Sequence, residues 1–175
     1  MNVLRLTTTN SRERNWDSAE DIALHLGRFL DEALEEAASD QDPEFLPVAF
    51  VHTAAQGRAG LSYPAPRDPR EGAHTAEALT ILLKAMDTHA AGICQLGWFA
   101  SAGLPPALAA RVPDGRAGVQ VAVIVAADRD GELVTRLGVV ERAPGQHPKV
   151  DVWEQLSWTE VGGRDSLGPP QWRLP

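Results

Sequence analysis

The stretch that decides the fold is VQVAVIVAADRDGELVTRLGVVE, residues 119–141. Residues 119–126 are apolar at nearly every position, which predicts a strand that is buried on both faces and lies centrally in a sheet. The pair Asp130-Gly131 is a strong hairpin signal, because glycine accepts a positive φ and aspartate bonds to its own backbone. We therefore predict a return strand over 133–141, paired antiparallel with the first.

The acidic groups of this turn also suggest a metal site, and Asp128, Asp130 and Glu132 are its weak candidates. A calcium loop of the EF-hand type needs oxygen ligands at the first, third and fifth positions, glycine at the sixth and glutamate at the twelfth. Counted from Asp128, the sixth residue is Leu133 and the twelfth is Val139. The pattern fails where the geometry is strictest, so we expect no metal and interpret the aspartates as turn residues.

Two segments have the periodicity of amphipathic helices. In the first, apolar residues from Ile22 to Ala37 recur on one face, Asp17 or Ser18 caps the start, and Pro43 prevents continuation. The second is expected to begin at Thr75 and to stop at Gly92, a residue type that often ends helices. Its apolar face is formed by Leu79, Leu82, Leu83, Met86 and Ala90.

Short apolar runs at 46–53 and 93–100 and an alternating segment at 150–158 complete the predicted strands, and 61–63 is a candidate return strand. Residues 64–72 contain three prolines, in PAPRDPREG, and are predicted to form an exposed loop. Consecutive hairpins favour an α+β fold: a mainly antiparallel sheet of about five to six strands, with the two principal helices packed on one face.

The chain of 175 residues fits one domain, which we place at 16–161. Residues 1–15 are interpreted as an N-terminal arm or edge strand. Residues 162–175 lack periodicity and are expected to form an extended tail.

Composition excludes several classes of function. The net charge of −8 and pI near 5.0 disfavour nucleic acid as a partner, because an acidic surface repels phosphates. We find no apolar run long enough to span a bilayer and no secretory signal, so no membrane partner is expected. The single cysteine excludes an intrachain disulfide framework, which makes a cytoplasmic location the default. High Ala, Gly, Arg and Asp with low Lys suggest a bacterial or phage source.

The candidate catalytic residues are His52, His74 and Cys94. His52 lies at a predicted strand end, where acid/base groups often occur, and the three residues are candidates for one cluster in space. No two histidines have the i, i+4 spacing of a helical zinc site. The alternative reading of Cys94 is a small buried hydrophobic residue. We expect no cofactor.

Tryptophans point to a different activity. Trp98, Trp153 and Trp158 lie in predicted strands and are interpreted as core. Trp172 and Leu174 lie in the tail sequence PPQWRLP, where aromatic and proline residues favour docking to a protein surface. With Arg67 and Arg70 of the loop they are the predicted partner contacts. The sequence thus favours a non-enzymatic interaction or assembly subunit, with self-association through the tail as one form; the alternative is a small hydrolase using histidine and acidic groups.

Overall fold

The computed structural model describes residues 5–7, 16–37, 47–54, 57–63, 69–112, 118–143 and 146–156. Its strands are β1 (Arg5–Thr7), β2 (Val48–Thr53), β3 (Gly57–Ser62), β4 (Thr88–Ala100), β5 (Gly118–Asp128), β6 (Leu133–Val139) and β7 (Trp153–Leu156). Its helices are α1 (Ala19–Ala37), α2 (Pro69–Ala85) and the short α3 (Pro106–Ala109), preceded by a 3₁₀ turn at Ser101–Gly103.

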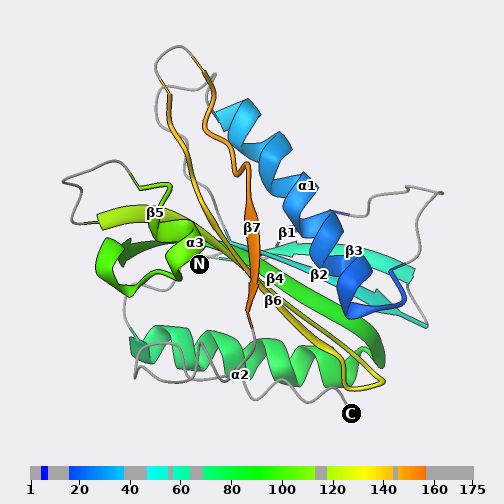
Figure 1. Ribbon diagram of the computed structural model, residues 1–175. Helices are drawn as coiled ribbons and strands as arrows, with labels where there is room; N and C mark the ends of the chain where they lie inside the picture. Colours follow the sequence, from blue (N-terminus) through cyan, green and yellow to red (C-terminus); the bar gives the residue numbers. More distant parts are fainter. Residues whose placement is uncertain are drawn as a thin grey trace.

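The strands form one seven-stranded sheet in the order β1-β3-β2-β4-β5-β6-β7 (Figure 1). Every neighbouring pair is antiparallel. The three residues of β1 form one edge of the sheet and β7 forms the other. The α+β class and the mainly antiparallel sheet are confirmed.

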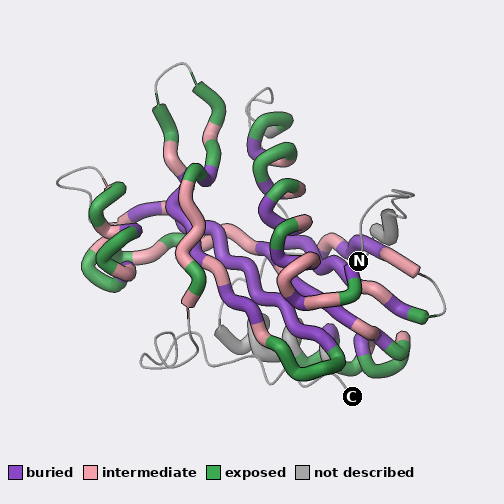
Figure 2. The backbone as a smooth tube through the Cα atoms, turned by 45° about the vertical axis from the view of Figure 1, so that its right-hand side comes forward, coloured by how far each residue is buried: buried purple, intermediate pink, exposed green. Residues whose placement is uncertain are grey.

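The hairpin at the centre of the sequence argument is present as β5 and β6. Its register runs from Val121↔Val139 to Ala127↔Leu133. Gly131 has a φ of +87°, the conformation for which glycine is suited. β5 is buried along most of its length, as expected for a central strand (Figure 2).

The two long helices lie on opposite faces of the sheet, so the prediction that both cover one face is wrong (Figure 1). Along β2, Val48 and Phe50 join the cluster under α1, whereas Ala49 and Val51 join the clusters under α2. The physical reason lies in the central strands themselves. Strands that are apolar on both faces need cover on both faces.

The predicted bounds of the second helix are also wrong at both ends. α2 begins at Pro69, within the predicted loop, where a missing N–H costs a helix nothing. It ends at Ala85 because Asp87 adopts a positive φ of 50° and the Thr88 hydroxyl donates to the Leu83 carbonyl. His89 and Ala90 consequently belong to β4.

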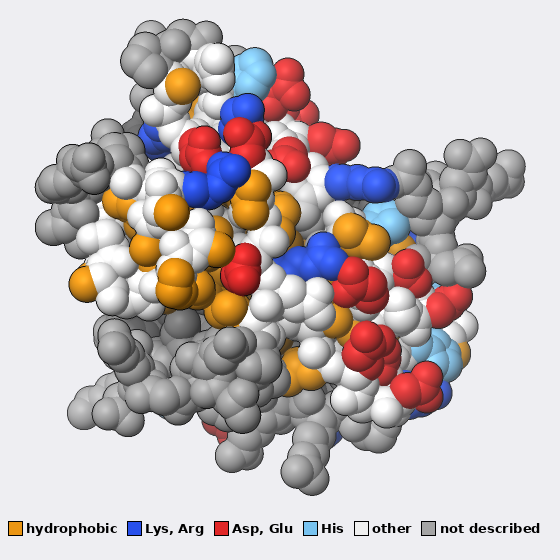
Figure 3. Space-filling model, viewed as in Figure 1, with side chains coloured by type: hydrophobic (Ala, Val, Ile, Leu, Met, Phe, Trp, Pro, Cys, Tyr) orange, Lys and Arg blue, Asp and Glu red, His pale blue; other side chains and the backbone are white. Residues whose placement is uncertain are grey.

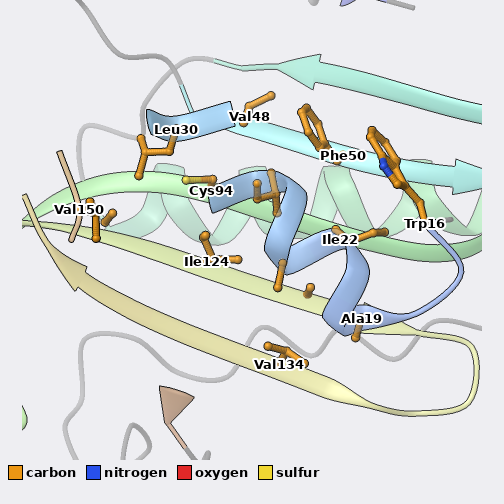
Figure 4. Close-up of a cluster of buried hydrophobic side chains, with 14 of the residues drawn as sticks. Trp16, Ala19, Ile22, Leu30, Val48, Phe50, Cys94, Ile124, Val134 and Val150 are labelled. Atoms are coloured by element: carbon orange, nitrogen blue, oxygen red, sulfur yellow. The ribbon is translucent and has the colours of Figure 1, made fainter. Parts of the chain in front are cut away.

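α1 approaches β4 closely at Gly92, which is a strand residue and not the predicted helix stop. A Cβ atom here would lie 2.6 Å from Ile22 Cγ2, 2.8 Å from Leu26 Cδ1 and 3.0 Å from Ala126 Cβ. Figure 4 shows the resulting core, in which side chains of α1 such as Ile22 and Leu30 lie among those of the strands, Cys94 and Ile124 included. Because Gly92 has no side chain, α1 can pack directly against β4.

We predict that Gly92→Ala lowers the free energy of unfolding by about 1–3 kcal/mol, the usual cost of overpacking a core. Chemical denaturation measures this. The control is Gly118→Ala, because a Cβ at that strand position meets its nearest neighbour, the Phe99 carbonyl oxygen, at an ordinary 3.5 Å. Equal stability of the two variants would mean that α1 does not depend on this contact.

Candidate interaction surface and histidine cluster

Asp128, at the end of β5, joins the hairpin to the start of α1. Its side chain is only 6% exposed. Oδ1 accepts hydrogen bonds from the backbone N–H groups of Asp130 and Glu132, both at 3.0 Å. Oδ2 accepts one from the N–H of Ala19 at 3.1 Å. The carboxylate therefore shapes the turn and caps a helix, and its oxygens are already occupied by backbone donors.

The described residues of the turn do not form a metal-binding group. Across the described ranges, no group of three or more His, Cys, Asp or Glu side chains is arranged to hold a metal ion. Asp130 and Glu132, the other two weak candidates, are exposed. Ser18 completes the helix cap, since its hydroxyl accepts from the Asp21 N–H and donates to the Asp21 carboxylate.

We predict that Asp128→Ala lowers the free energy of unfolding by about 2–4 kcal/mol, because three backbone donors lose a charged acceptor. Asp130→Ala is the matched control: the residue is exposed in the same turn, and its loss is expected to cost less than about 0.5 kcal/mol. Thermal or urea unfolding separates the two. A neutral Asp128→Ala variant would contradict the role assigned to this carboxylate.

A histidine cluster lies beside the start of α1. His52 Nδ1 is 3.2 Å from Asp17 Oδ1, which is within ion-pair distance although the two atoms do not form a hydrogen bond. The rings of His52 and His89 are 5.7 Å apart, centroid to centroid. They meet because the β2–β4 register shifts by one residue, from His52↔Ala90 to Thr53↔Thr88, which leaves His89 as an extra residue. Such irregularities re-aim side chains.

Trp16 holds this end of the helix in place. It is 3% exposed and stacks on Phe50, with ring centroids 4.8 Å apart (Figure 4). His25 contacts it edge-on, and the guanidinium of Arg58 lies 5.6 Å from its ring centroid. These contacts fix the residue that immediately precedes Asp17. The sequence does not reveal this cluster, because Asp17, His52 and His89 come from three separate segments and the helical pattern predicts a helix at His89.

The three predicted catalytic residues do not share a site. His74 lies exposed on α2, on the other face of the sheet from His52. Cys94 is buried in the core under α1, four residues along β4 from the Ala90 that pairs with His52. Burial raises the pKa of the Cys94 thiol far above its ordinary value, so it remains protonated and unreactive. The interpretation of Cys94 as a buried hydrophobic residue fits these facts.

Arg67, Trp172 and Leu174 lie outside the described residues, as does Trp158. Arg70 lies in the first turn of α2. Trp153 is half-buried against the core under α1, as predicted. Trp98 is exposed, so the prediction that it belongs to the core is wrong.

Trp98 is 76% exposed, although it lies on β4, the middle strand of the sheet, and was predicted to be core. Along β4, Cys94 and Leu96 face the core under α1, and Trp98 follows two residues later on the same face. The side chains of α1 cover Ala90, Cys94 and Leu96, and this end of the strand lies past that cover. The amphipathic pattern of a helix does not show which part of a neighbouring strand the helix will cover.

The surroundings of Trp98 carry little charge. No charged residue occurs between His89 and Arg111 in the sequence. After Trp98, the side chains of Ala100, Ala102, Pro106, Ala107 and Ala110 are exposed as the chain turns round the end of the sheet. In Figure 3, hydrophobic and uncharged side chains gather over β5 and α3, whereas acidic side chains gather over α1. We call the exposed residues of 98–110 the Trp98 surface.

Two arginines near this surface bond to other described residues of the chain. Gln120 pairs with Trp98 across the β4–β5 ladder, and its side-chain oxygen accepts a hydrogen bond from Arg142 at 2.9 Å. Arg111, which follows α3, forms an ion pair with Glu141. These four side chains form a polar edge beside the exposed Trp98.

Comparisons of the chain with models of known protein families, with curated proteins and with solved structures each found no match. In the part of the chain that the structure describes, no helix combines the length and apolar character needed to cross a bilayer. Function therefore has to be argued from the geometry of this chain alone.

Proposed function

We propose that this protein is a non-enzymatic interaction or assembly subunit that binds a protein through the Trp98 surface. The observation that carries the proposal is the 76% exposure of Trp98 on the middle strand of the sheet. Exposing a large aromatic ring to water forgoes the free energy of its burial, and tryptophan is strongly enriched at the centres of interfaces. Isolated exposed apolar residues are common, but here the neighbouring residues are uncharged as well.

Further contacts belong to the proposal. The tail residues Trp172 and Leu174, together with Arg67 and Arg70, are proposed to add area around the same partner. The partner is a protein and not nucleic acid, because the net charge of −8 opposes contact with phosphates. A cytoplasmic location is also proposed, consistent with a chain whose single cysteine is unpaired.

We predict that a photoreactive p-benzoylphenylalanine at position 98 cross-links to a discrete protein in the cells that carry the gene. The same probe at position 81 is the control, because Ile81 is 63% exposed but lies on α2, on the other face of the sheet. A covalent adduct at 98 and none at 81, seen on a denaturing gel, is the expected result. Equal or absent adducts at the two positions would refute an interaction role for Trp98.

The histidine cluster favours a second candidate, a small hydrolase in which His52 acts as general base on a water molecule and Asp17 orients its ring. The 3.2 Å contact between these side chains and the nearby ring of His89 support this reading. The Asp17 side chain is 63% exposed, so solvent screening weakens its electrostatic interaction with His52.

The hydrolase candidate predicts activity on a simple ester that falls by about 100-fold or more in His52→Ala, the usual contribution of a general base. His147→Ala is the control, because that histidine is exposed in the turn between β6 and β7 and far from the cluster in sequence. Initial rates of 4-nitrophenyl ester hydrolysis distinguish the variants. Rates that are equal in both variants, or no higher than free imidazole gives, would exclude the hydrolase.

A further inference from the structure

The charge of the chain restricts how two copies can meet. With a net charge of −8, two molecules repel each other in most orientations. Acidic residues lie along α1, which carries Asp31, Glu32, Glu35 and Glu36. The Trp98 surface is different, because its residues carry no charge of either sign. Here two copies can approach without bringing carboxylates together.

We propose that the occupant of the Trp98 surface is a second copy of this chain, placed by a two-fold axis so that the Trp98 of each copy packs against the surface of the other. This inference rests on the proposed function and names its partner. A two-fold interface needs a patch that complements itself. An uncharged patch meets this condition, whereas a patch with a net charge would select a partner of the opposite sign.

The rim of the surface is compatible with such a contact. Arg111 is paired with Glu141, so its charge is compensated within the chain. Arg142 is exposed and donates to the neutral side chain of Gln120, so the proposed contact leaves its guanidinium at the solvent-exposed edge. Burying an unpaired charge would oppose association, and the internal pairing reduces that cost.

The area requirement shows which residues must take part. A stable interface buries about 800 Å² on each partner, and one tryptophan supplies about 150–250 Å². Trp98 therefore anchors the contact, and the exposed alanines and Pro106 of the segment that follows it must supply much of the rest. Trp98 lies on the α1 face of the sheet, whereas α3 packs on the opposite face, so the proposed contact has to wrap around the end of the sheet.

Sedimentation equilibrium of the purified full chain tests the inference, over about 1 µM to about 1 mM, which brackets the dissociation constants of weak and moderate dimers. We expect the mass to rise with concentration from 18.8 kDa toward twice that value. Trp98→Glu, which adds a like charge at the two-fold contact, is expected to weaken the dimer at least about 30-fold, as loss of a hot spot does. Ile81→Glu, with the same change of charge at an exposed residue of α2 that is outside the Trp98 surface, is expected to dimerise as the wild type does.

Each other outcome overturns the inference in a recognisable way. A wild-type chain that stays monomeric at every concentration excludes the second copy, while an adduct to a different protein at position 98 would leave the proposed function standing. A dimer that survives Trp98→Glu but is lost when residues 163–175 are removed assigns self-association to the tail. A dimer lost in Ile81→Glu and kept in Trp98→Glu places the contact on α2. Circular dichroism of Trp98→Glu confirms folding, which an exposed site should not disturb.

Discussion

The close contact of α1 with β4 at Gly92 is the constraint on which the rest of the molecule depends. The contact is tighter than any side chain permits, since Ile22 and Leu26 occupy the space that a Cβ would need. Asp128 then fixes the start of the helix by accepting from the Ala19 N–H. A helix held at these two points has little freedom to slide along the strands. Its position decides which end of the sheet is covered and which end is open.

Both candidate sites follow from that placement. At the covered end, the residues before α1 bring Asp17 and Trp16 against β2, where the shifted register also aims His89 toward His52. At the other end, β4 continues past the helix and Trp98 faces solvent. The histidine cluster thus forms where α1 begins. The Trp98 surface is exposed because β4 extends beyond the part of the sheet that α1 covers.

The parts of the fold that could be predicted depend on local chemistry. The β5–β6 hairpin follows from Asp130-Gly131 and two β-rich runs, and α1 follows from its apolar period and its Ser18 cap. The sequence could not show which face of the sheet each helix covers. Hydrophobic periodicity identifies the apolar side of a helix but not the surface against which that side packs. The role of Gly92 could not be predicted for a related reason: glycine occurs both at helix ends and where elements pack closely, and only the packed structure distinguishes the two.

The exposure of Trp98 could not be predicted from residue type, since tryptophan on an apolar strand is usually buried. A usable signal was nonetheless present in the sequence, in the uncharged run between His89 and Arg111. Copies of an acidic chain repel each other electrostatically. This repulsion is weaker where a long uncharged stretch lies at the surface. In a strand, the same stretch would be expected to lie inside the core. The side chains of α1 do not reach the Trp98 surface, so a stretch with the composition of a core strand is exposed to solvent, and this exposure is the basis of the proposed interaction.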